Sequence, residues 1–179
     1  SKGLPEAREA IVRYCKRKNI PNVTEKDVYT GNGVSELITM AMQGLLDFGD
    51  EVLVPAPDYP LWTASVTLAG GTAVHYLCDE KSHWYPDLAD MEKKITPRTK
   101  GIVVINPNNP TGTLAAADEI VALAEVGARK GTDILVDESF LDFLEADEAY
   151  SVLRQAWDRD NLFVIRSLTK FYALPGLRL

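Results

Sequence analysis

The chain has 179 residues, a formal net charge of −7 and a hydrophobic fraction of 46%. This length suits one domain with a sizeable core, and the acidic balance without a basic run argues against nucleic acid or an anionic membrane surface as the main partner. No apolar stretch approaches the roughly 20 residues of a membrane span, and no signal peptide is visible.

Segments with helical and strand patterns alternate along the chain. Apolar residues recur at helical spacing in some segments and form short continuous runs in others. Such alternation predicts βαβ units, and therefore an α/β fold with a mainly parallel sheet covered by helices on both faces. Helices are expected at 5–19, 34–46, 60–70, 86–95 and 116–130, and strands at 51–55, 72–77, 101–106, 133–138 and 162–167.

The cysteines and histidines form no recognisable site. Cys15 and Cys78 lie far apart and next to neither a CxxC motif nor a histidine cluster. Free thiols in a reducing cytoplasm are therefore favoured over a disulfide or a metal site. His75 and His83 fit no ligand spacing, so no metal is expected.

The first candidate site lies where Gly31-Asn32-Gly33 leads into the predicted helix at 34–46. Backbone N–H groups at such a junction form an anion site, and Ser35 adds a hydroxyl. The same residues also suit an ordinary helix start, with Ser35 and Glu36 in the first turn. Both interpretations can hold at once.

Two further candidates, Tyr59 and Asn109, follow the predicted strands at 51–55 and 101–106. Open α/β sheets bind ligands beyond the carboxyl ends of their strands. Tyr59 lies there and offers an aromatic face to a flat ligand, although plain packing is the alternative. Trp62 is assigned to the core. Asn106, Asn108 and Asn109 are, by themselves, all interpreted as turn formers.

Asp137 stands where the predicted strand at 133–138 leaves the sheet. A carboxylate at that position can hold a proton on a ligand nitrogen, because an opposite charge at hydrogen-bond distance stabilises the protonated form. The alternative is a solvated loop acid. Glu138 is expected to be such an acid, or a partner for a neighbouring group.

Lys170 follows the predicted strand at 162–167 and precedes a turn. Ser167 and Arg178 flank it, and a hydroxyl and a permanent cation are groups that could converge on one phosphate. The simplest interpretation is a lysine held for Schiff-base chemistry with a phosphorylated aldehyde. The lysine of an isolated S-x-x-K motif, however, is more often a solvated charge on the surface.

Five segments in this order resemble the fold type I pyridoxal-phosphate-dependent aminotransferases of class I/II: GNGVSEL, PAPDYPLW, NPNNPTG, VDESF and SLTKFYALPGLRL. The resemblance implies a bound pyridoxal 5'-phosphate (PLP), with Lys170 as its Schiff-base lysine and Asp137 on the pyridine nitrogen. It assigns the phosphate to Gly33, Val34, Ser35, Ser167 and Arg178, the ring face to Tyr59 and the ring oxygen to Asn109. Amino acid and 2-oxo acid substrates and a homodimer are also implied.

Residues 1–113 look more like the alanine aminotransferase branch, whereas residues 114–179 resemble threonine-phosphate decarboxylases and histidinol-phosphate aminotransferase-like enzymes. Most aminotransferases of this class carry a tyrosine three residues after the aspartate, where its hydroxyl bonds the ring oxygen, but this chain has Phe140. Amino transfer is the expected function. A decarboxylase-like PLP lyase and a non-catalytic PLP-binding module or fragment are the alternatives.

The same resemblance identifies residues 1–179 as the PLP-binding large domain, apparently truncated at both ends. The small C-terminal domain of the family is expected to be absent from this sequence. That domain carries the arginine that grips the substrate carboxylate, so this arginine is not assigned.

Overall fold

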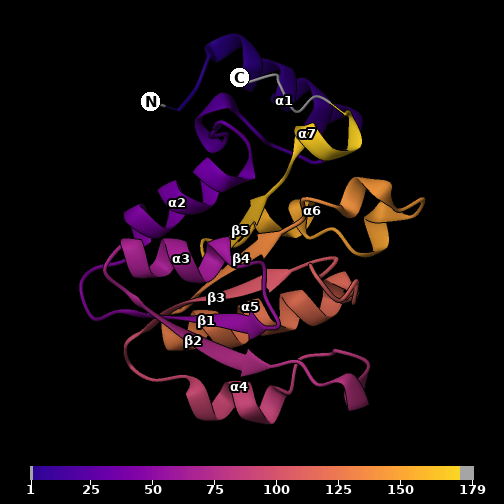
Figure 1. Cartoon of the computed structure of the whole chain (residues 1–179). Coiled ribbons are helices and arrows are strands. Elements are labelled where there is room, and N and C mark those ends of the chain that lie inside the picture. Colours follow the sequence, from indigo (N-terminus) through magenta and orange to yellow (C-terminus); the bar gives the residue numbers. More distant parts are fainter. Residues whose placement is uncertain (1, 174–179) are drawn as a thin grey trace.

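The structure is a computed structural model, and it describes residues 2–173. Within these residues helices and strands alternate as the sequence predicts (Figure 1). None of the described helices combines the length and the hydropathy that crossing a bilayer would require. The strands are β1 (Glu51–Ala56), β2 (Thr72–Leu77), β3 (Thr99–Ile105), β4 (Asp133–Asp137) and β5 (Leu162–Ile165), and the helices are α1 (Pro5–Arg17), α2 (Val34–Leu45), α3 (Leu61–Leu68), α4 (Leu88–Lys94), α5 (Ala117–Lys130), α6 (Leu153–Ala156) and α7 (Leu168–Phe171).

The strands form one five-stranded sheet in the order β2-β1-β3-β4-β5. Every neighbouring pair of strands is parallel. The predicted α/β fold with a parallel sheet is therefore confirmed. Because β1 lies between β2 and β3, the chain changes direction across the sheet at β1, and open sheets bind ligands at such switch points.

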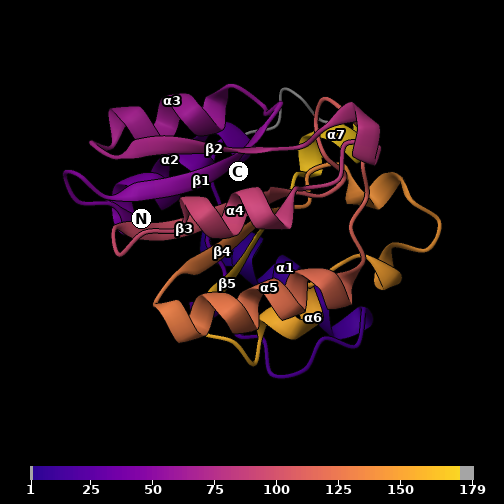
Figure 2. The same cartoon turned by 90° about the horizontal axis from the view of Figure 1, so that it is seen from below.

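Side chains from the strands alternate between two hydrophobic cores. Leu53, Ile102 and Ile134 pack on the face that α4 and α5 cover. Val52 and Val103, their neighbours in the chain, pack on the opposite face, beneath α2 and α3. This alternation follows from the period of two residues in a strand, and it explains why these strands are continuous apolar runs. Figure 2 shows α3 and α5 on opposite sides of the sheet.

Local signals account for the ends of α5. Glu119 accepts a hydrogen bond from the Ala116 N–H at 2.8 Å, which satisfies one of the free donors at the start of the helix. Gly131 ends the helix in the left-handed conformation, with φ 68°, which a residue without Cβ adopts at little cost. The helix thus begins and ends close to its predicted bounds.

Candidate functional site

A cavity of about 350 Å³ lies where the segments that follow β1, β3, β4 and β5 approach the start of α2. Ligand pockets typically measure roughly 300–1,000 Å³, so the volume suits a small cofactor. Every predicted site residue that the structure describes lines this cavity: Gly33, Val34, Ser35, Tyr59, Asn109, Asp137, Ser167 and Lys170. Arg178 lies outside the described residues.

One end of the cavity is the start of helix α2. Gly33 is the N-cap residue, with φ 78° and ψ 176°, a conformation that is essentially restricted to glycine. Glycine offers no side chain to the N–H groups of the first turn, which therefore remain available to an anion. Ser35, in that first turn, is exposed. The geometry thus combines a helix N-terminus with a hydroxyl on one wall.

Ser167 lies on another wall of the same cavity and is 3% exposed. Its hydroxyl is 2.9 Å from the hydroxyl of Thr169. These two groups face a cavity that Ser35 also lines. Three hydroxyls and a helix N-terminus around one cavity form a donor set suited to a phosphate.

Asp137 is 4% exposed at the end of β4. One carboxylate oxygen accepts hydrogen bonds from the backbone N–H of Ser139, at 3.0 Å, and from the Ser139 hydroxyl. The other accepts from Trp62 Nε1 at 3.3 Å. Burial raises the pKa of the Asp137 carboxyl, and the bonds from Ser139 and Trp62 lower it. A cationic nitrogen in the cavity would relieve the cost of burying this charge.

Lys170 is exposed on α7. Its Nζ lies 5.8 Å from the centroid of the Phe140 ring, within range of a cation–π contact. Tyr59, 37% exposed, also lines the cavity. An amine and aromatic groups therefore share one space with the Asp137 carboxylate.

The asparagines of the turn after β3 differ in role. Asn106 is 1% exposed. It accepts from the Ala115 N–H at 2.9 Å and donates to the Ala115 carbonyl at 3.0 Å, so it holds the turn together as predicted. Asn108 accepts from the Thr111 hydroxyl at 2.8 Å. Of the three, only Asn109 lines the cavity among the residues that the structure describes.

Sequence reasoning missed Trp62, Ser139 and Thr169. Trp62 is fully buried, as expected of a core residue, but its indole N–H also contacts Asp137, 75 residues away. No local pattern marks such a contact. Ser139 follows Asp137 by two residues, and a short-range hydroxyl–carboxylate bond of this kind is a common turn feature that the sequence could have indicated.

These groups together define which ligand the cavity suits. A flat ligand with an anionic end would find the start of α2 and the hydroxyls at one wall, an aromatic side chain, a carboxylate and a primary amine. Within residues 2–173 no cluster of three or more His, Cys, Asp or Glu side chains is placed to hold a metal ion. The groups present suit a phosphorylated aldehyde that an amine can capture.

Comparisons with known proteins agree with this arrangement. The model of the family "Aminotransferase class I and II" matches residues 1–179. The chain is 50% identical to the glutamate-pyruvate aminotransferase AlaA of Escherichia coli over 179 residues, which are 99% of this chain and 44% of that protein. It is 49% identical to an alanine aminotransferase of Mycobacterium tuberculosis over 180 residues, 99% of this chain and 42% of that protein.

Solved structures give the same result. Alanine aminotransferase from Pyrococcus furiosus superimposes with a TM-score of 0.86 at 39% identity, covering 99% of this chain and 45% of that one. A double mutant of Thermus thermophilus aspartate aminotransferase gives 0.89 at 32% identity, covering 99% and 46%. The likeness to alanine aminotransferases thus extends through both parts of the sequence. The chain spans less than half the length of these relatives.

Proposed function

Because the chain belongs to the aminotransferase class I and II family, we propose that it is the PLP-binding part of an enzyme that transfers an amino group between an amino acid and a 2-oxo acid. The observation that carries this proposal is the convergence of Lys170, Asp137 and the start of α2 on one cavity. Family membership alone would not locate a site. An amine, a buried carboxylate and an anion site are the groups that this chemistry needs.

Pyridoxal phosphate, when bound, supplies an aldehyde that captures amines and a ring that accepts the electron pair released at the substrate's α-carbon. Lys170 would hold the aldehyde and, once freed, accept the proton from that α-carbon. Asp137 would hold a proton on the pyridine nitrogen. Its bonds from Ser139 and Trp62 would keep the carboxylate oriented.

The other residues of the cavity would bind rather than react. The start of α2, with Ser35, and the hydroxyl of Ser167 would hold the phosphate, together with Arg178. Tyr59 would cover one face of the ring, and Asn109 would bond the ring oxygen. These contacts would orient the bonds at the substrate α-carbon relative to the ring. Such positioning is a main contribution that a protein makes to cofactor chemistry.

The relatives suggest the substrates. Two of them are named as a glutamate-pyruvate aminotransferase and an alanine aminotransferase, so we propose alanine or glutamate as amino donors and their 2-oxo acids as acceptors. This choice favours amino transfer over the decarboxylase alternative. A homodimer, which the family resemblance implies, completes the proposal, and its size is testable by sedimentation. A cytoplasmic location, which the free cysteines favour, is part of the same proposal.

The test begins with the purified protein and PLP. We expect visible absorbance from the lysine-bound cofactor and its permanent attachment on borohydride reduction. Lys170→Ala should abolish the attachment, whereas Lys130→Ala, on the last turn of α5 away from the cavity, should not. Equal trapping in the Lys170 variant would refute the assignment.

Proton exchange then separates an enzyme from a binding module. With the protein and PLP present, the α-proton of alanine should exchange with deuterium faster than it does with PLP alone. Binding of PLP with exchange no faster than that of the free cofactor would instead favour a non-catalytic module.

A further inference from the structure

Two charged residues are next to site residues in the sequence, but their side chains do not line the cavity. Glu138 follows Asp137, and Arg166 precedes Ser167. Asp137 and Ser167 line the cavity, whereas Glu138 and Arg166 do not. Glu138 directly follows β4, and Arg166 and Ser167 directly follow β5. Consecutive side chains of an extended chain point to opposite sides, which agrees with this division.

Glu138 and Arg166 bind each other across the ends of β4 and β5. Arg166 Nε donates to Glu138 Oε2 at 2.9 Å. Close to this ion pair, the Glu138 N–H donates to the Ile165 carbonyl at 2.8 Å. β5 ends at Ile165, and the chain then enters α7, which carries Lys170. The ion pair is therefore a side-chain link between the strand end that carries the acid and the segment that carries the amine.

Further bonds fix the orientation of Glu138, which is 0% exposed. Its carboxylate also accepts from the Val152 N–H at 2.7 Å and from the Ser151 hydroxyl at 3.0 Å. Burial raises the pKa of the Glu138 carboxyl, and the charge of Arg166 lowers it. A buried carboxylate with donors from three residues has little freedom to move.

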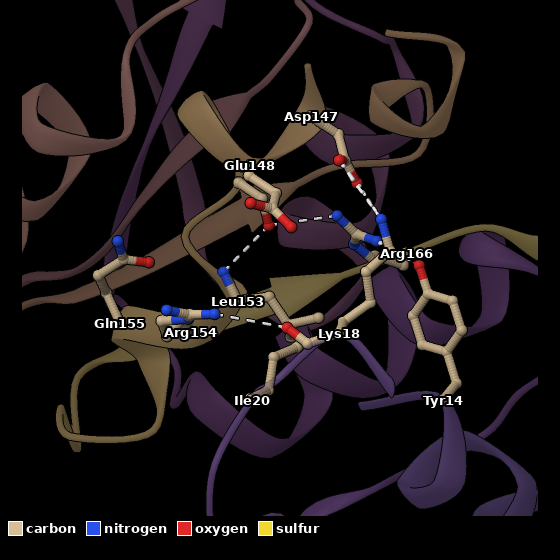
Figure 3. Close-up of a pocket in the computed structure, with 10 residues that line it drawn as sticks. Tyr14, Lys18, Ile20, Asp147, Glu148, Leu153, Arg154, Gln155 and Arg166 are labelled. Carbon is tan, nitrogen blue, oxygen red and sulfur yellow. Dashed lines mark hydrogen bonds and ion pairs between the residues drawn. The ribbon is translucent and has the colours of Figure 1, made fainter. Parts of the chain in front are cut away.

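The guanidinium of Arg166 connects this pair to other parts of the chain. It donates to Asp142 Oδ1 and to the Ser151 hydroxyl, each at 3.2 Å, and to the Tyr14 hydroxyl at 3.4 Å. Figure 3 shows Arg166 and Tyr14 at a small pocket of about 160 Å³. Tyr14 belongs to α1, so one planar side chain joins the end of β5 to α1 and to the segments after β4.

A role in stability alone does not explain this arrangement. A buried ion pair gains little net stability over well-packed apolar residues, because both charges lose their hydration. What distinguishes this ion pair from apolar packing is its fixed geometry, because several directional hydrogen bonds set the relative position of the groups they join. We propose that Glu138 and Arg166 are positioning residues that hold the ends of β4 and β5 at the separation at which Asp137 and Lys170 act on one bound cofactor.

The inference rests on the proposed function, so the experiment measures two functional quantities for each variant, together with its fraction folded. The first is trapping of PLP by borohydride, and the second is α-proton exchange in alanine at saturating PLP. A melting curve of the cofactor-free protein gives the fraction folded at the assay temperature. Glu138→Gln keeps the shape of the side chain and removes its charge.

The matched control is Glu51→Gln. Glu51 is 6% exposed and pairs with Arg98, whose Nε donates to Glu51 Oε1 at 3.0 Å. It stands at the start of β1, on the edge of the sheet opposite the cavity. The control therefore also removes the charge of a buried glutamate from an arginine pair, but away from the site.

We expect Glu138→Gln to retain trapping and to lower exchange about 10- to 100-fold, the effect of a small misplacement of reacting groups. Arg166→Lys keeps the positive charge but loses the planar guanidinium. Its exchange rate should therefore lie between that of Glu138→Gln and that of the parent. Glu51→Gln should stay within about twofold of the parent.

Exchange at the parent's rate in Glu138→Gln would overturn the inference, as would an equal loss in Glu51→Gln at the same fraction folded. If Glu138→Gln does not fold, Arg166→Lys decides by the same comparison, and the parent's rate in that variant would overturn the inference. A parent protein that traps no PLP would refute the proposed function, and this inference with it.

Discussion

Replacing Asp137 by asparagine should separate binding of the proposed cofactor from its chemistry. The side chain is 4% exposed, and Ser139 and Trp62 fix both carboxylate oxygens. Asparagine has nearly the same shape but carries no charge. It would leave the size of the cavity nearly unchanged and remove the group that we propose holds a proton on the pyridine nitrogen.

The magnitude follows from the charge and its burial. An opposite charge at hydrogen-bond distance shifts a pKa by roughly 1–3 units, which is about 1.4–4 kcal/mol. Each 1.36 kcal/mol is about tenfold in rate. Because Asp137 is almost completely buried, solvent screens the interaction little, and the upper half of the range applies. We therefore expect Asp137→Asn to slow α-proton exchange by about 100- to 1,000-fold.

The assay follows deuterium exchange at the α-carbon of alanine by NMR in excess PLP. It needs no second substrate and no complete transfer cycle. Borohydride trapping on Lys170 should remain, because the amine is unchanged. If the variant exchanges as fast as a parent that clearly exceeds free PLP, Asp137 has no role in the proton transfer.

The same substitution tests the pKa shift without cofactor. Burial raises the pKa of the Asp137 carboxyl above its ordinary value of 3.8, so the folded protein binds the proton more tightly than the unfolded chain. The resulting stabilisation is fully present below the unfolded pKa and is lost as the pH rises through the folded pKa. The melting temperature of the parent should therefore fall relative to that of Asp137→Asn as the pH rises. A difference that moves in the opposite direction would contradict the shift.

Three further substitutions test neighbouring groups. Trp62→Phe removes the indole donor to Asp137 and some buried volume. A denaturant titration should show that the free energy of unfolding falls by about 1–3 kcal/mol. Phe140→Tyr adds the hydroxyl that the family places on the ring oxygen, so PLP affinity should rise by about 0.5–1.5 kcal/mol in a fluorescence titration; weaker binding would argue against that contact. Arg178→Ala should lose about 1.5–3 kcal/mol of PLP affinity, whereas Arg154→Ala should not, and similar titrations for the two would make Arg178 an ordinary surface charge.

Much of the fold was predictable because local patterns of apolar and polar residues indicate the strands and helices. The continuous apolar run Ile134–Val136 predicted a strand buried on both faces, and β4 is such a strand. The sequence pattern places Tyr59 and Asp137 at or beyond the carboxyl ends of predicted strands, where open sheets bind ligands. Asn109 is assigned to the same site by the family resemblance alone. All three line the same cavity.

Only the tertiary structure decided which side chains meet across the sheet. Trp62 reads as core in the sequence, yet its indole reaches Asp137 because α3 packs over the face to which Asp137 points. Glu138, expected as a loop acid or a partner, is buried because β4 and β5 are neighbours and Arg166 directly follows β5. Local periodicity specifies each element, but strand order and packing choose its partners, and those are properties of the whole chain.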